Sequence, residues 1–484
     1  MIGSRRGFVL TYSPRFPLLV RIDLSMFRSH RSPYSFRQRK QSLHFWPTVL
    51  WVIVGLVGLE LGMNVLVLLT SQRDRIINAT GDNAEANQYK LAFLTPEGNS
   101  LTGIPQSGKL AAKSSVAVGY ELFPEQTSEV WTINAQGFRD PEPVPLEKPE
   151  GEIRIFLLGG STAFGQGIKD QASILTERLN ARFQERLEQQ QRSPEKYQPT
   201  VLPPTAEQRQ RIAQLPPRLR SGNYRVINAA IPGYASGNQL AQLALRILPY
   251  NPDVIIVLNG YEDLMLDSSQ ESVGIPVKSN LLQQPFQYFW ILVSHPIQRT
   301  IQNTMTAKVL QYYVFKDYPG LAERSLPVRD SGKTFDQYLP DSPDSEEMTR
   351  RVQRYRQHTL QMIRIAAGAR VPLVVALQPE ITGISPEKRT SEESTIVQDL
   401  EPNYTDLLTA GYAQLSASND QLESAFPNNV KVLNYYDLFD SFSATAFLDT
   451  IHLTAAAHQA VSERFYNALA DLPQLQQRPV EPVK

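Results

Sequence analysis

The chain has 484 residues, 42% of them hydrophobic and 9% aromatic, so it can build a large core and exceeds one compact domain of usual size. Lys plus Arg and Asp plus Glu number 48 each, a balance that gives no indication of a nucleic-acid partner. The absence of cysteine excludes disulfides, thiolate metal sites and cysteine catalysis.

Charge is unevenly distributed at the N-terminus. Residues 1–45 carry nine Lys or Arg side chains against Asp23 alone, a net charge of +8, so the remainder carries −8. We expect residues 1–45 to form a basic cytoplasmic tail, because positive flanks stay on that side of a membrane. Met26 precedes a shorter basic leader and is an alternative start.

Residues 46–70 follow as a long apolar segment. About 20 apolar residues are needed to cross about 30 Å of hydrocarbon, and the segment predicts an uncleaved transmembrane anchor that leaves the C-terminal bulk extracytoplasmic. A cleaved signal peptide is the alternative, but the run is too long and lacks a nearby A-x-A-like site. Glu60 and Asn64 are its strongly polar side chains. Glu60 either belongs to a proton path or contacts a partner helix, or it is a neutral carboxyl that a neighbour satisfies or that a lone anchor tolerates.

The rest of the chain alternates between strand and helix patterns. Residues 71–150 are expected to be an extended lead-in, 151–472 the main domain with a surface insertion at 192–222, and 473–484 a C-terminal tail. The expected strands are residues 153–158, 224–231, 252–260, 371–379 and 430–436. One expected helix begins at residue 174. The others cover residues 237–248, 281–315, 345–367, 403–425 and 454–472. This alternation predicts an α/β fold with a parallel sheet covered on both faces, and ligands at the carboxyl ends of its strands.

Ser161 lies in "FLLGGSTAFGQG", directly after the first of these strands. A Walker loop would need Lys where Gln166 stands, and a dinucleotide fingerprint would need Gly at Asp170. A lipase-type elbow would need Gly at Ala163. What remains is a serine on a strand-to-helix turn, with an exposed hydroxyl and an N–H near a helix N-terminus.

A nucleophilic serine needs a histidine base that a carboxylate orients. The chain has six histidines: His30, His44, His295, His358, His452 and His458. Only His452, in "FLDTIHLT", has an Asp three residues before it, Asp449. This pair is the candidate base and its orienting acid, although D-x-x-H alone is a weak motif. His458 is expected to be a surface or packing residue.

The chain resembles the SGNH (GDSL-like) hydrolases of the membrane-anchored bacterial type. "GGST" matches the first family block, with Ser161 as nucleophile, and "VINAAIPGYAS" the second, with Gly233 as the oxyanion glycine. "VLNGYEDL" falls where the family has G-x-N-D, and "DTIH" matches the block of Asp449 and His452. The resemblance implies a flavodoxin-like three-layer α/β/α domain. "INAQGFRD" before the first strand also looks like the family's lead-in, and its Arg139 either points into the site or forms a structural salt bridge.

Glu262 stands where the family has the Asn that donates to the oxyanion. An ionised carboxylate there would repel the developing charge, and the loss of one donor costs about 10²- to 10³-fold in rate. Three alternatives are open. Glu262 stays protonated and donates, or Asn259 supplies the amide through a shifted strand end, or the domain is catalytically weak and acts mainly by binding.

The sequence thus predicts a membrane-anchored, extracytoplasmic esterase. Ser161 attacks the ester, His452 is general base and acid, Asp449 orients it, and the N–H groups of Ser161 and Gly233 hold the oxyanion. The expected partners are an ester or O-acyl substrate on a glycan or lipid, and the bilayer through residues 46–70. No metal, organic cofactor or nucleic acid is expected. The alternatives are an O-acyltransferase on an envelope or extracellular glycan and an inactive binding protein with the same fold.

Overall fold

The computed structural model describes residues 45–79, 84–101, 108–275, 301, 304–315, 325–328 and 335–481. The predicted basic tail up to residue 44, the alternative start at Met26 and most of the predicted helical region 281–315 lie outside the described residues. The chain divides into two compact units, the first ending at Gly58 and the second beginning at Leu59.

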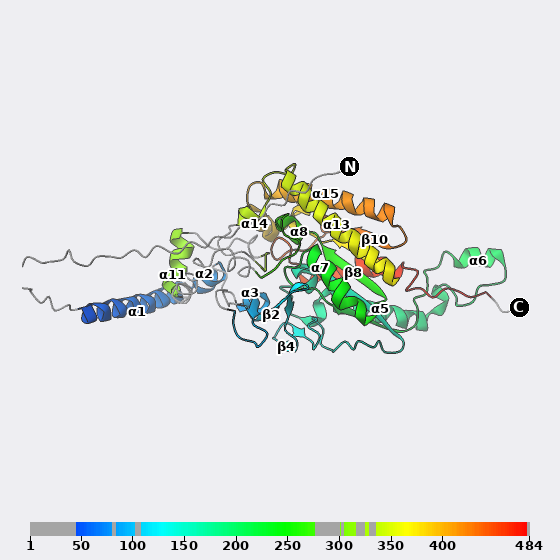
Figure 1. The fold of residues 1–484 in the computed structure, drawn as a ribbon, viewed down its shortest axis with the longest axis horizontal. Helices are drawn as coiled ribbons and strands as arrows, with labels where there is room; N and C mark the ends of the chain where they lie inside the picture. The colour runs from blue at the N-terminus through cyan, green and yellow to red at the C-terminus, as the bar shows by residue number, and fades with distance from the viewer. Residues whose placement is uncertain are drawn as a thin grey trace, which may run out of the picture. The chain divides into compact units, whose positions relative to one another are not determined.

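The N-terminal helix α1 covers Phe45–Leu69 and is drawn in blue in Figure 1. Its segment Pro47–Leu69 has a mean hydropathy of 2.3 and is almost entirely exposed. In length and composition it is the one helix of the described chain that could cross a membrane. The position of this helix agrees with the apolar segment predicted at residues 46–70.

Five parallel strands form the central sheet of the second unit. They are β6 (Glu152–Gly159), β7 (Asn223–Asn228), β8 (Val254–Asn259), β9 (Leu373–Leu377) and β10 (Val430–Asn434). Their order is β10-β9-β8-β6-β7. Strands β6, β8 and β9 are buried along their whole length, as their continuous apolar runs require, and the edge strands β7 and β10 are partly exposed. All five predicted strands are present, in the flavodoxin-like order.

Helices cover both faces of this sheet. The helices that follow the sheet strands are α4 (Ser161–Phe164), α5 (Leu175–Arg192), α6 (Ala206–Ile212), α7 (Ser236–Gln242), α8 (Tyr261–Met265), α13 (Glu346–Ala369), α14 (Ser391–Gln398), α15 (Tyr404–Ala425) and α16 (Ala455–Ala470). In β6, Ile155 and Leu157 join the core beneath α5 and α16, and the alternate residues Phe156 and Leu158 join the core beneath α13 and α15. Figure 1 shows α13 and α15 on one side of β8 and α5 on the other. The domain is therefore a three-layer α/β/α sandwich.

The segment before β6 has its own small sheets. They are built from β1 (Leu91–Leu94), β2 (Leu110–Ser115) and β3 (Gly119–Leu122), and from the pair β4 (Gln126–Thr127) and β5 (Thr132–Ile133), after the short helices α2 (Arg73–Ala79) and α3 (Ala84–Tyr89). The rings of Phe93, Tyr120 and Tyr234 stack edge to face, with centroids 5.3 and 5.2 Å apart. The first sheet therefore packs on the loop that follows β7.

Two regions differ in detail from the predicted pattern. The helix expected at residues 237–248 is α7 followed by a π turn at Leu243–Ile247 and a 3₁₀ turn at Leu248–Tyr250, where Pro249 interrupts the α-helical bonds. The segment 192–222 contains α6 and is bridged to the C-terminal tail, Val201 to Val480 and Leu219 to Gln476. The tail thus packs on this segment.

Candidate active site

Ser161 is the first residue of α4, directly beyond the carboxyl end of β6. Its side chain is fully buried, and its N–H lies in the first turn of a helix, where no intrahelical acceptor exists. The side chain of Glu262 fills the space beside the preceding Gly160, because a Cβ there would lie 2.0 Å from Glu262 Oε1. The turn that carries Ser161 and the Glu262 carboxyl are therefore packed against each other.

Asp449 and His452 form a hydrogen-bonded pair just before α16. His452 Nδ1 lies 2.5 Å from Asp449 Oδ2, while Asp449 Oδ1 accepts from the backbone N–H groups of His452, at 2.8 Å, and Ile451, at 3.0 Å. Burial alone would raise the pKa of Asp449, but His452 and these donors hold that pKa below its usual value. A carboxylate on Nδ1 leaves Nε2 of the imidazole to act as a base.

Thr162 links the turn of Ser161 to the loop that carries Asp449 and His452. Its hydroxyl donates to the Ile451 carbonyl at 3.1 Å and accepts from Gln378 Nε2 at 3.2 Å, so the residues beside Ser161 and His452 are in contact. Ser161 Oγ and His452 Nε2 are both buried and have no hydrogen-bond partner among the described residues. Catalytic hydrogen bonds are often long in substrate-free enzymes and tighten only when substrate binds.

Glu262 follows β8 and is buried in the first turn of α8. Burial raises the pKa of its carboxyl to about 8, although the nearby N–H groups of Glu262 itself and of Ser161 favour the charged form. Among the described residues, none forms a hydrogen bond of ordinary geometry with this carboxyl. The amide of Asn259, the other sequence candidate, donates to Gln239 Oε1 at 2.8 Å, and its oxygen accepts from Tyr355 at 3.2 Å. Of these two candidates, Asn259 therefore has hydrogen-bond partners for its amide, and Glu262 has none for its carboxyl among the described residues.

Gly233 lies in the loop after β7, with a φ of 84° that favours glycine. The small sheet before β6 supports this loop, because the buried Tyr120 hydroxyl donates to the Pro232 carbonyl at 2.6 Å. In return, the Tyr234 hydroxyl donates to the Tyr120 carbonyl. The position of the predicted oxyanion glycine therefore depends on the lead-in segment.

A pocket opens beside Gly233 and Glu262. The other residues that line it are Met265, Leu266, Gln270, Val273, Gly274, Leu326, Pro327, Val328 and Tyr338. Most of these side chains are apolar, and Val328 and Pro327 lie directly over Gly233, 3.2 and 3.8 Å from where a Cβ would stand. The predicted oxyanion residues therefore face a space suited to a small apolar group.

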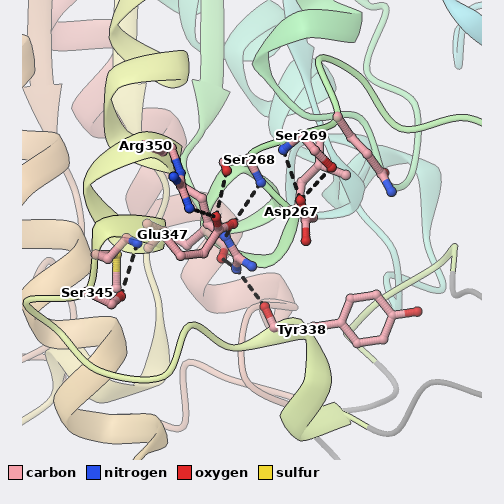
Figure 2. Close-up of polar contacts among 12 residues, drawn as sticks. Asp267, Ser268, Ser269, Tyr338, Ser345, Glu347 and Arg350 are labelled. Atoms are coloured by element: carbon pink, nitrogen blue, oxygen red, sulfur yellow. Dashed lines mark hydrogen bonds and ion pairs between the residues drawn. The ribbon is translucent and has the colours of Figure 1, made fainter.

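Glu347 on α13 contacts the loop after α8, near the lining residues Leu266 and Gln270, and Figure 2 shows its polar contacts. Its carboxylate accepts from the Ser268 N–H and hydroxyl, at 2.8 and 2.6 Å, and from Arg351 Nε at 2.7 Å. Arg351 also donates to the Leu264 and Tyr338 carbonyls, so both sides of the pocket are tied to α13. Burial opposes ionisation of Glu347, but Ser268 and Arg351 outweigh it and lower its pKa to about 2.

Arg139 contacts the carboxyl end of α4, the helix that begins with Ser161. It is buried and donates to the carbonyls of Phe164 and Gly165 at the end of α4, at 2.8 and 2.9 Å, and to Val130 at 2.8 Å. Within the described residues it forms no ion pair. His458 is also buried, and burial, with Arg139 nearby, lowers its pKa to about 3, so this imidazole is neutral.

Some contributing residues were not singled out from the sequence. Gln378 is the clearest, because it follows β9 directly in "VVALQP", the same strand-end position that identified Ser161 and Glu262. Tyr120 and Thr162 carried no such signal. No group of three or more His, Asp or Glu side chains that could hold a metal ion occurs in the described chain.

No protein-family model matches the sequence, and no curated protein matches it. Solved structures that are similar to the chain include a lipase/acylhydrolase from Enterococcus faecalis, at 11% identity over 66% of this chain and 95% of that one, with a TM-score of 0.31. A variant of an acetyl xylan esterase from Geobacillus stearothermophilus has 10% identity over 69% and 97% of the two chains and a TM-score of 0.32. A psychrotrophic esterase from Pseudoalteromonas has 11% identity over 65% and 96%, with a TM-score of 0.29.

At these TM-scores the matches do not assign an activity, and the fold is identified from the chain itself. The sheet has the flavodoxin-like strand order. Ser161, Gly233 and Glu262 follow β6, β7 and β8, and the Asp449–His452 pair precedes the last helix, in the order of the four family blocks. The chain therefore has a three-layer α/β/α fold of flavodoxin-like strand order, and these segments lie in the order that the resemblance to the SGNH hydrolases predicts.

Proposed function

We propose that the protein is a membrane-anchored, extracytoplasmic serine hydrolase that cleaves ester bonds. Ser161 attacks the ester carbonyl, and His452 Nε2 takes the hydroxyl proton and then donates it to the leaving alcohol. Asp449 holds the imidazole in the required tautomer. In the second step, water attacks the acyl-enzyme. His452 Nε2 takes a proton from this water and returns it to Ser161 Oγ as the carboxylic acid leaves. The α1 helix anchors the chain, and the basic residues before it keep its N-terminus in the cytoplasm.

The observation that carries this proposal is the Asp449–His452 pair beside the Ser161 turn. Its 2.5 Å contact fixes Nδ1, and Thr162 joins the Ser161 turn to the Ile451 carbonyl at 3.1 Å. Ser161 Oγ and His452 Nε2, which exchange the proton in this proposal, are among the buried polar atoms without a hydrogen-bond partner in the described part of the chain. Buried polar groups are normally hydrogen-bonded, so two unpaired groups on segments that Thr162 joins are consistent with a role in binding or catalysis.

In this proposal the oxyanion is held by the N–H groups of Ser161 and Gly233 and by the protonated carboxyl of Glu262. A buried carboxylic acid that is neutral near pH 7 can donate a hydrogen bond as an amide does. Glu262 is preferred to Asn259, whose amide is already bound to Gln239. The acyl group occupies the pocket beside Gly233, and the substrate is an O-acyl ester of a glycan or lipid.

Serine-directed labelling tests this proposal. We expect a fluorophosphonate to label the full-length protein in detergent at Ser161, identified by peptide mass, and Ser161→Ala to abolish labelling. His452→Gln should slow labelling by about 10²- to 10⁴-fold, because the general base is lost. Hydrolysis of a chromogenic acetyl ester should fall in parallel. Equal hydrolysis by the native protein and Ser161→Ala would contradict the assignment of this site.

A further inference from the structure

Glu60, the one charged side chain of α1, is bound by a segment far away in the sequence. Its carboxylate accepts from the backbone N–H groups of Met305, at 2.6 Å, and Thr306, at 3.0 Å, and from the Thr306 hydroxyl at 2.7 Å. Asn64, one turn further along α1, donates to the same carboxylate at 2.9 Å. The two N–H groups begin helix α11 (Met305–Leu310), where a helix has no internal acceptors for them.

The position of Glu60 along α1 sets the depth of this contact. Glu60 lies nine residues before Leu69, the end of the apolar segment, which at 1.5 Å per residue is about 14 Å of helix. The hydrocarbon core of a bilayer is about 30 Å thick. If α1 spans the membrane, the start of α11 meets it well inside the core. Lipid offers no hydrogen bonds there, so Glu60 supplies the acceptor that the N-terminal N–H groups of α11 require.

The composition of the segment 304–315 fits the same environment. Its inner face joins a small apolar cluster formed by Met63, Val67, Ile76, Ile77, Met305, Val309 and Tyr312. Its outer face exposes Leu310, Tyr313 and Val314, with exposed fractions of 40, 53 and 62%. Lys308 is its one charged residue, and a lysine stem can carry its charge toward the headgroups. In Figure 1, α11 lies beside α2, the helix that follows α1.

We propose that residues 304–315 are a second membrane-embedded element, tied to α1 through Glu60 and covered on their outer face by lipid acyl chains. This inference rests on the part of the proposed function that makes α1 a membrane anchor. It accounts for a carboxylate in the apolar helix, for the donors that surround it, and for the exposed apolar side chains of α11 and the π turn Gln311–Phe315 that continues it.

The absence of native cysteine makes a depth measurement direct. The full-length protein would carry a bimane label on Val314→Cys and be reconstituted in phosphatidylcholine and phosphatidylglycerol vesicles. Leu61→Cys, 64% exposed on α1, is the control inside the bilayer, and Leu245→Cys, 60% exposed on the α/β/α domain, is the control in water. We expect nitroxide-labelled acyl chains to quench Leu61→Cys, and to quench Val314→Cys severalfold more strongly than Leu245→Cys.

The controls separate the two levels of the proposal. Quenching of Leu61→Cys but not of Val314→Cys would overturn the second membrane element and leave the anchor intact. Absence of quenching at Leu61→Cys would instead contradict the anchor in the proposed function. Ester hydrolysis, measured on the same vesicles, reports on the active site independently of both results.

Substitutions of Glu60 test whether its contact with Met305 and Thr306 holds residues 304–315 against α1. In Glu60→Leu the N–H groups of Met305 and Thr306 lose their acceptor, and we expect quenching of the Val314→Cys label to fall to the level of Leu245→Cys. Glu60→Gln keeps an acceptor oxygen and should retain the quenching. Unchanged quenching at Leu61→Cys shows that α1 remains inserted. If Glu60→Leu left quenching at Val314→Cys unchanged, Glu60 would not hold the segment.

Discussion

Glu262 is a carboxylic acid in surroundings that would suit an apolar residue. It is 4% exposed, and its carboxyl lies against the backbone at Gly160, the residue before Ser161. Burial raises its pKa to about 8, so at neutral pH the carboxyl is mainly protonated and has a proton to donate. A family amide in this position would donate at every pH, whereas the acid donates only below its pKa. This difference is directly measurable.

We expect kcat/KM for a chromogenic acetyl ester to fall as the pH rises through about 8, because deprotonated Glu262 repels the oxyanion. In Glu262→Gln, an isosteric amide donor, the alkaline fall should disappear. The pH dependence of kcat/KM reports the free enzyme, the state to which this pKa belongs. Rates of Ser161→Ala, subtracted at each pH, remove base-catalysed hydrolysis. An alkaline fall that persisted in Glu262→Gln would assign it to another group.

The same pKa affects stability with a definite sign. The folded protein holds the Glu262 proton up to about pH 8, while the unfolded chain releases it near the ordinary value of 4.5. The folded state therefore binds more protons between these values, and the free energy of unfolding falls as the pH rises through this range. Glu262→Gln should flatten this dependence, and urea unfolding at several pH values measures it.

Among the elements, the short helix α4 is held by contacts from several distant parts of the chain. Arg139 binds its last carbonyls, and Thr162 links it to the strand end after β9 and to the loop that carries His452. A four-residue helix has too few internal hydrogen bonds to fix its own position. The orientation of Ser161 is thus determined by tertiary contacts.

We expect Thr162→Val to lower kcat about 10- to 100-fold while KM changes little, because a displacement of the nucleophile relative to His452 affects the chemical step most. Valine keeps the shape but leaves the Ile451 carbonyl without this donor. Thr176→Val is the matched control, since Thr176 is equally buried and its hydroxyl has no partner in the described chain. Equal steady-state kinetics in the two variants would contradict a positioning role for Thr162.

The sequence predicted most of the secondary-structure elements of the central sheet and its helices. The central strands were identifiable because "IRIFLL" and "PDVIIVLNG" are continuous apolar runs, and their spacing by long helices implied a parallel sheet. The small sheets of β1–β5 were not, since strands of two to six residues with mixed polarity give no period. Ser161 and His452 stand at recognisable positions. The protonation of Glu262 was left open, because a pKa depends on burial that the sequence does not specify.

In the α/β/α unit as a whole, segments outside the central sheet complete the site. The connection between α8 and α13 forms a wall of the pocket at Leu326 and Val328, and also contains the contact with Glu60. The lead-in supplies Tyr120, which supports the loop of Gly233, and Tyr89, whose hydroxyl donates to the Ile168 carbonyl after α4. The sheet, the lead-in and the connection thus form the site together.

We expect Tyr120→Phe to lower the free energy of unfolding by about 1 to 3 kcal/mol, because the buried Pro232 carbonyl loses its donor. It should also lower kcat/KM, since Gly233 is the next residue. Tyr435→Phe removes a buried hydroxyl that has no partner among the described residues, so it should be neutral or slightly stabilising. Thermal unfolding of the full-length proteins compares the two. Equal melting temperatures would show that the lead-in contact is dispensable.

The close approach of Gly160 to Glu262 also has an evolutionary consequence. A side chain at position 160 would begin 2.0 Å from Glu262 Oε1, so the Glu262 carboxyl would have to leave its present position. The present position of the Glu262 carboxyl is thus compatible only with glycine at 160. Among descendants of a common ancestor, we therefore expect glutamate at 262 to occur mostly with glycine at 160, whereas glycine at 160 sets no limit on the residue at 262.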